Sequence, residues 1–141
     1  MSAKILDGLK TAEKVKTRVT EKVGARKSAG LSQPGLAVIL VGDNPASATY
    51  VRHKQKACEA VGIRSHVHRL PKDTPQETIE QCIDQLNQDD KVHGILLQLP
   101  LPNGIRADDL LERIDPNKDI DGFHPYNLGR LSQRRPQLRP C

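Results

Sequence analysis

The chain has 141 residues, enough for one domain with a buried core and too few for two domains of ordinary size. No apolar stretch is long enough to cross a bilayer, and the opening segment MSAKILDGLK lacks the apolar run of a secretory signal, so we expect a soluble, cytoplasmic protein without a membrane partner. The three cysteines form no C-x-x-C pair, which argues against a disulfide framework and a zinc site.

The net charge of +5 suits a protein that binds an anion, and nucleic acid is the first partner to consider. The basic residues are scattered through every segment, and two Tyr, one Phe and no Trp leave few rings on which bases can stack. We therefore expect no nucleic-acid partner. A basic surface equally suits a small polyanionic substrate, because a positive cleft concentrates negative ligands.

The first part of the chain predicts a long helix and then a buried strand. After a possible short strand at 5–6, apolar residues recur with the spacing of an amphipathic helix, at Leu9, Ala12, Val15, Val19 and Val23. Gly24 and Gly30 weaken the end of this helix, and Pro34-Gly35 predicts a turn. The run LAVILV that follows is apolar throughout and rich in β-branched residues, which is typical of a buried parallel strand.

A second helix and a second strand follow directly. Asn44 and Pro45 supply an N-cap and a first-turn proline for a helix that runs to about Val61 and is closed by Gly62. The segment 63–70 predicts the second strand.

The next segment predicts another helix, a third strand and a short fourth helix. Thr74-Pro75-Gln76-Glu77 has the pattern of a capping box, before a helix with the apolar face Ile79, Cys82, Ile83 and Leu86. HGILLQLP at 93–100 predicts a strand ended by prolines, and 107–114 a short helix. Apolar strands that alternate with helices indicate an α/β fold: a three-layer, open, mainly parallel sheet flanked by helices. We place this domain at 1–125 and an aperiodic connector at 126–141.

Lys54 stands on the inward face of the helix after the first strand, among the apolar positions Tyr50, Val51, Ala57, Cys58 and Val61. Its amine either extends to solvent or lies in a cleft, where the cost of burying a charge makes it useful as a proton carrier. Tyr50 lies one turn before Lys54, so its ring either projects beside the amine or packs in the core.

Gln98 follows the apolar run of the third strand, near the carboxyl end of that strand. A buried amide needs partners, which are either nearby backbone groups or a ligand. Ligands of open parallel sheets bind beyond the carboxyl ends of the strands, where the turn before the Lys54 helix also emerges. Gln98 and Lys54 are therefore placed to face one cavity.

Several further residues are candidates for binding. A calcium loop read from Asn117 fails because Leu128 stands where a bidentate Glu is required. Asp121, beside a glycine, is placed to accept paired hydrogen bonds from a ring with N–H donors, with ordinary turn chemistry as the alternative. Ser47 either caps its helix or contacts a ligand. His66 and His68 share a strand face without a third ligand, so we expect no metal site.

Three motifs in order carry a specific resemblance: Y-V-R-H-K at 50–54, G-I-L-L-Q-L-P-L-P at 94–102 and K-D-I-D-G-F-H-P at 118–125. Together with V-G-D-N-P-A-S at 41–47 they resemble the bifunctional methylenetetrahydrofolate dehydrogenase/methenyltetrahydrofolate cyclohydrolase family. The resemblance implies that Lys54 is the catalytic lysine and Gln98 the partner that tunes it. It also implies that the Tyr50 ring stacks on the folate and that Asp121 anchors the pterin edge, while Ser47, Leu99 and Pro100 line the cleft.

The same resemblance implies NADP-dependent oxidation of 5,10-methylenetetrahydrofolate and hydrolysis of the methenyl product to 10-formyltetrahydrofolate in one cleft, by a homodimer. The chain contains no G-x-G-x-x-G motif and no P-loop, so we expect no dinucleotide site within it. It departs from the family pattern at Pro140-Cys141, where the family continues into a Rossmann domain that holds NADP. The resemblance therefore predicts that these residues fold but lack dehydrogenase activity; a non-catalytic folate-binding fragment and a basic nucleic-acid-binding module are the alternatives.

Overall fold

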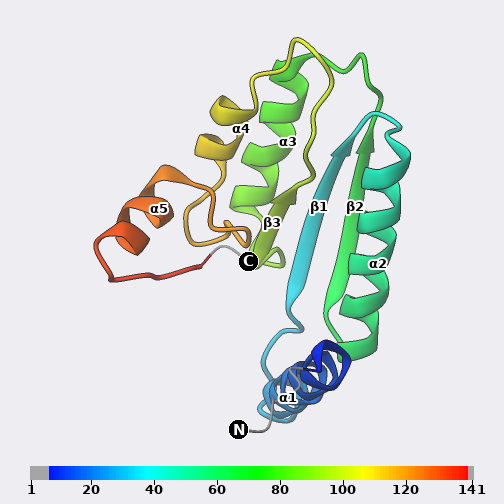
Figure 1. The fold of residues 1–141 in the computed structure, drawn as a ribbon, viewed down its shortest axis with the longest axis vertical. Helices are drawn as coiled ribbons and strands as arrows, with labels where there is room; N and C mark the ends of the chain where they lie inside the picture. Colours follow the sequence, from blue (N-terminus) through cyan, green and yellow to red (C-terminus); the bar gives the residue numbers. More distant parts are fainter. Residues whose placement is uncertain (1–6, 140–141) are drawn as a thin grey trace, which may run out of the picture.

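A computed structural model describes residues 7–139 and contains one small open sheet. The three strands are β1 (Gly35–Val41), β2 (Arg64–Leu70) and β3 (Gly94–Leu97). They are all parallel and lie in the order β2-β1-β3, with β1 in the centre (Figure 1). The predicted α/β class, with an open parallel sheet between helices, is confirmed.

Helices cover both faces of the sheet. Helix α2 (Pro45–Val61) lies against one face, and α3 (Gln76–Gln88), with α4 (Ala107–Arg113) beside it, lies against the other (Figure 1). Side chains of a strand alternate between faces. Ala37, Ile39 and Val41 of β1 therefore join the core under α3, whereas Val38 and Leu40 join the core under α2.

The helix that carries Lys54 has the predicted bounds and caps. The Asn44 side chain accepts a hydrogen bond from the Ser47 N–H at 3.1 Å, and Pro45 occupies the first turn, where its missing N–H costs nothing. Gly62 ends the helix in the left-handed conformation with φ 81°. These local signals fix the start of α2 directly after the central strand.

The predicted capping box at Thr74 is wrong. Helix α3 begins at Gln76, its N-cap position is held by Pro75, and no side chain caps it. The helix begins one residue later than the box requires, so Thr74 lies before the N-cap position, and Pro75, which holds that position, has no side-chain acceptor. The buried face of this helix is confirmed: Ile79, Ile83 and Leu86 lie in the core and Cys82 packs against it.

The two ends of the described chain differ most from expectation. Helix α1 (Gly8–Ser28) exists and continues through Gly24, but it has no buried residue, and Leu9 is 84% exposed. It lies beyond the end of the sheet, near the C-terminal end of α2 (Figure 1). The segment expected to be aperiodic contains α5 (Pro125–Ser132), whose Asn127 is fully buried. The possible strand at 5–6 falls outside the described residues. Within 7–139, no helix combines the length and apolar character needed to span a membrane.

Candidate active site

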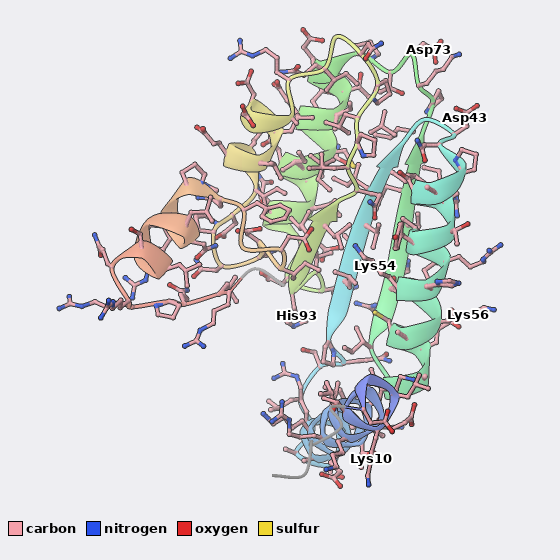
Figure 2. The ribbon with its side chains drawn as sticks, in the orientation of Figure 1. Lys10, Asp43, Lys54, Lys56, Asp73 and His93 are labelled. Carbon is pink, nitrogen blue, oxygen red and sulfur yellow. The ribbon has the colours of Figure 1, made fainter. Side chains whose placement is uncertain are left out.

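Lys54 and Gln98 meet across the face of the sheet that α2 covers. The Lys54 amine donates a hydrogen bond to the Gln98 side-chain oxygen, with an Nζ–Oε1 distance of 3.4 Å. Figure 2 shows Lys54 directed from α2 toward the sheet, whereas Lys56 of the same helix is directed away from it. Lys54 is half-buried and Lys56 is exposed. The structure thus brings together the two side chains that the sequence placed near one cavity.

The register of β3 explains why Gln98 faces α2. Leu96 belongs to the core under α2 and Leu97 to the core under α3, so the alternation continues to place Gln98 on the α2 side. The backbone N–H of Gln98 still donates to Ile39 of the central strand, at 2.9 Å. Its side-chain amide donates to the Leu99 carbonyl at 2.7 Å. The side-chain oxygen is thereby oriented toward Lys54.

Asp121 lies in the loop beside the outer edge of β3. Burial raises the pKa of its carboxyl group, the charge of Lys54 acts in the opposite direction, and the charge of Asp119 adds to the rise. Among these three residues the direct contact is the one between Lys54, from a helix, and Gln98, from a strand end, while Asp121 comes from a loop and is linked to Lys54 through charge.

The other predicted site residues differ in how far they are buried. Tyr50 is 62% exposed, so its ring is free of the core and accessible to a ligand. Ser47 is buried in the first turn of α2, and its backbone N–H donates to the side chain of Asn44, which is the N-cap of this helix. Leu99 is half-buried; Pro100 is exposed and lines a cavity of about 270 Å³ with Gly42, Asp43, Asn44, Lys72, Leu101 and Pro102.

Asp119 is a buried polar residue that the sequence analysis did not single out. It is 2% exposed, and its carboxylate accepts hydrogen bonds from three backbone N–H groups and from Asn127. The signal was available: an Asp three residues before a Gly is typical of a carboxylate that closes a loop onto itself.

The turn after β1 does not suit a dinucleotide. In a parallel sheet the N-terminus of the following helix is the usual phosphate site. Here the Ser47 N–H already donates a hydrogen bond to the Asn44 side chain, so it is not available to a phosphate. The exposed carboxylate of Asp43 would also repel a pyrophosphate. The turn contains a single glycine, Gly42. His66 is exposed and His68 half-buried, and no cluster of three metal-ligating side chains occurs in the part of the chain that the structure describes.

Residues 6–121 match the family described as tetrahydrofolate dehydrogenase/cyclohydrolase, catalytic domain. Among solved structures, the bifunctional enzyme FolD, a methylenetetrahydrofolate dehydrogenase/cyclohydrolase of Campylobacter jejuni, is 48% identical and superposes with a TM-score of 0.96. The similarity covers 99% of this chain and 50% of that one.

Two eukaryotic structures are similar over the same region. A 5,10-methylenetetrahydrofolate dehydrogenase of the silkworm Bombyx mori is 41% identical, with a TM-score of 0.94 over 99% of this chain and 48% of that one. The Trypanosoma brucei dehydrogenase-cyclohydrolase, solved with NADP and an inhibitor, is 36% identical, with a TM-score of 0.92 over 100% of this chain and 49% of that one. The chain thus spans about half the length of these proteins.

Proposed function

The chain belongs to the tetrahydrofolate dehydrogenase/cyclohydrolase family, and we propose from this premise that it forms the folate-binding, catalytic part of a one-carbon enzyme. The proposed reactions are oxidation of 5,10-methylenetetrahydrofolate to the methenyl form and hydrolysis of that product to 10-formyltetrahydrofolate. The observation that carries the proposal is the contact between the Lys54 amine and the Gln98 oxygen.

The hydrolytic step is the one to which these residues contribute directly. Addition of water to the methenyl carbon releases a proton, and opening of the carbon–nitrogen bond takes one up, so an amine beside this carbon serves both transfers. Lys54 is the proposed proton carrier. Gln98 holds its amine through a neutral oxygen, which fixes its position without adding charge.

The remaining site residues are proposed to orient the substrate. The exposed ring of Tyr50 offers a flat apolar surface for a pterin ring, with the amine of Lys54 one turn away on the same helix face. Asp121 is proposed to accept hydrogen bonds from the N–H groups at the pterin edge. Ser47, Leu99 and Pro100 complete the proposed lining. The anionic glutamate tail of a folate gives the net positive charge of the chain a role.

The dehydrogenase step requires NADP as the hydride acceptor. The described residues do not form a site that suits this cofactor. Because the turn after β1 lacks a phosphate cradle, we propose that NADP binds outside residues 7–139 in the whole enzyme. We accordingly expect the 141-residue chain to bind folate without catalysing NADP-dependent turnover. A dehydrogenase rate typical of the family from this chain alone would contradict that expectation. We also propose that the whole enzyme is a homodimer.

The folate site is tested with two lysines of one helix. Folic acid is titrated by calorimetry against the wild-type chain, Lys54→Ala and Lys56→Ala. Loss of a hydrogen bond to a charged group costs about 1.5–3 kcal/mol, so Lys54→Ala is expected to weaken affinity by roughly tenfold to a hundredfold. Lys56→Ala removes the same charge from the exposed side of α2 and is expected to stay within about twofold of wild type. Equal affinities of the two variants, or no binding by the wild type, would refute the assignment.

A further inference from the structure

The loop that carries Asp121 is closed by a buried carboxylate two residues earlier in the chain. One oxygen of Asp119 accepts hydrogen bonds from the N–H groups of Gly122 at 3.0 Å and Phe123 at 3.3 Å. The other accepts from the His124 N–H and from the Asn127 side-chain amide, both at 2.9 Å. Four donors thus compensate for the loss of water around this carboxylate, and all of them lie after Asp121 in the chain.

The conformation of the loop depends on Gly122. With φ at 70°, Gly122 adopts the left-handed conformation, which turns successive backbone N–H groups toward one concave side. The Asp119 carboxylate occupies that side. In the chain, Asp121 lies between Asp119 and the N–H groups that donate to the Asp119 carboxylate. These hydrogen bonds therefore fix the backbone of Asp121 on both sides.

The start of the loop is anchored independently to the sheet and to α3. The Ile95 N–H of β3 donates to the Lys118 carbonyl at 2.7 Å, and Asp119 forms an isolated parallel bridge with Ile95. The Lys118 amine donates to three carbonyl oxygens at the end of α3, those of Leu86, Asn87 and Asp89. Both ends of the loop are therefore held, one by Lys118 and the other by the Asp119 carboxylate.

We propose that Asp119 is a positioning residue of the folate site, which holds the loop in the shape that presents Asp121 toward Lys54. This inference rests on the proposed function, because it gives Asp119 a role only if Asp121 contacts the substrate. Asp119 does not touch substrate itself. Through Asn127 it also joins α5 to the loop, so the helix that follows is part of the support for Asp121.

An amide at position 119 is the smallest change that breaks the arrangement. Asn keeps one oxygen acceptor, but its NH₂ group would face N–H donors and leave two of them without an acceptor. We therefore compare wild type, Asp119→Asn, Asp121→Asn and the double variant, with folic acid as the probe. Each single change is expected to weaken affinity about tenfold, and the double variant is expected to bind no more weakly than Asp121→Asn, because Asp119 acts through Asp121. Losses that multiply in the double variant would overturn the inference.

Asn127→Ala provides a second route if Asp119→Asn does not fold. It removes one of the four donors and leaves the charge of Asp119 in place. We expect it to weaken folic acid about threefold in the wild-type background and to have no effect on top of Asp121→Asn. An equal loss in both backgrounds would show that α5 affects binding by another route, which contradicts the proposal.

A measurement without ligand separates this inference from the proposed function. Carboxyl ¹³C NMR follows the titration of Asp121 in wild type, in Asn127→Ala and in Asp115→Asn. Asn127→Ala removes a donor to Asp119 but leaves the charges of Asp119 and Lys54 in place, so a change in the titration of Asp121 reports its displacement. Asp115 is the control because its carboxylate accepts hydrogen bonds only from Asn117 among the described residues. We expect the titration midpoint of Asp121 to shift in Asn127→Ala and to stay unchanged in Asp115→Asn. An unchanged midpoint in Asn127→Ala overturns the positioning role even if folic acid binds; absence of folic acid binding by wild type overturns the proposed function alone.

Discussion

The two faces of the sheet differ in composition and in use. Under α3 and α4 lies an apolar cluster that takes residues from two strands, both helices and the segments around them, including Ile39, Ile83, Ile95 and Leu110. Under α2 the buried apolar cluster contains only Val38, Leu40, Val51 and Leu96. Lys54 and Gln98 lie on this second face, at positions that the helix and strand periods would otherwise give to the core.

The α3 face of the sheet contributes mainly to stability, whereas the α2 face carries the residues of the proposed site. Apolar burial supplies most of the free energy of folding, so the α3 face contributes the larger share. Burial of polar groups such as Lys54 and Gln98 costs free energy because they lose contact with water. This cost falls on the α2 face, where the apolar core is smaller, and leaves the stability of the α3 face unaffected. Three measurements test this difference between the two faces.

The largest expected difference comes from two neighbouring leucines on opposite faces. Leu96 and Leu97 are each 3% exposed, and Leu96 packs under α2 whereas Leu97 packs under α3. Replacement of a buried Leu by Ala costs about 2–5 kcal/mol, with the highest cost where the surroundings cannot collapse into the cavity. We expect Leu97→Ala near the upper end and Leu96→Ala near the lower end, from urea unfolding. Equal losses, or the reverse order, would contradict this difference between the faces.

Two Gly→Ala substitutions test the two faces of the sheet by adding a Cβ atom, where the leucine variants remove atoms. A Cβ on Gly35 would collide with the backbone carbonyl of Lys91, in the turn that follows α3. A Cβ on Gly94 would collide with the side chain of Ile120, in the Asp121 loop. Since backbone yields less readily than a side chain, Gly35→Ala is expected to cost about 1–3 kcal/mol and Gly94→Ala less. Urea unfolding measures both changes.

Affinity should follow the opposite order in these glycine variants. Gly94→Ala is expected to weaken folic acid binding, because displacement of Ile120 moves Asp121, whereas Gly35→Ala is expected to leave binding unchanged at temperatures where it is folded. Gly129→Ala is the control: nothing lies within 4 Å of its added Cβ, and Ala in place of a helical Gly stabilises by up to about 1 kcal/mol. A tighter complex in Gly94→Ala would refute the link between Ile120 and the site.

The smallest expected effect is a pH-dependent one at Asp121. Because burial raises the pKa of this carboxyl group in the folded state, the folded protein favours the protonated form, and stability is lost as pH rises through that folded pKa. Asp121→Asn removes the charge, so the variant is expected to be more stable than wild type at pH 7, within about 1 kcal/mol. The difference should vanish below about pH 4, where the carboxyl group of unfolded wild type is also protonated.

Asp84 of α3 supplies the control of opposite sign. Its hydrogen bonds from Arg113 of α4, both 2.8 Å long, lower the pKa of its carboxyl group. The stability it provides is present at neutral pH and is lost as pH falls through the lowered pKa. Asp84→Asn should therefore be less stable than wild type at pH 7, again with no difference in strong acid. Urea unfolding at pH 7 and in acid measures both variants, and the same sign in both would contradict the opposite pKa directions of Asp121 and Asp84.

The chain-local features were predictable because their causes lie within a few residues. Asn44, Pro45 and Gly62 define α2 by capping and backbone preference, and the apolar run of β1 identifies a strand buried on both faces. The motif residues Lys54 and Gln98 were recognisable as polar groups at positions where an apolar residue is expected. Their catalytic roles, and that of Asp121, stay predictions.

Local sequence patterns predict the three strands, helices α1 to α4 and their order, and the polar residues at apolar positions, because helix and strand periods are read from neighbouring positions; they miss α5. The contact between Lys54 and Gln98, which are 44 positions apart, follows from the packed fold, because it depends on the strand order β2-β1-β3 and on the face against which α2 packs. The packed fold also decides that the apolar stripe of α1 is left unburied and that Asp119 gathers four donors. Burial and hydrogen-bond partners are properties of the packed chain, and no local pattern contains them.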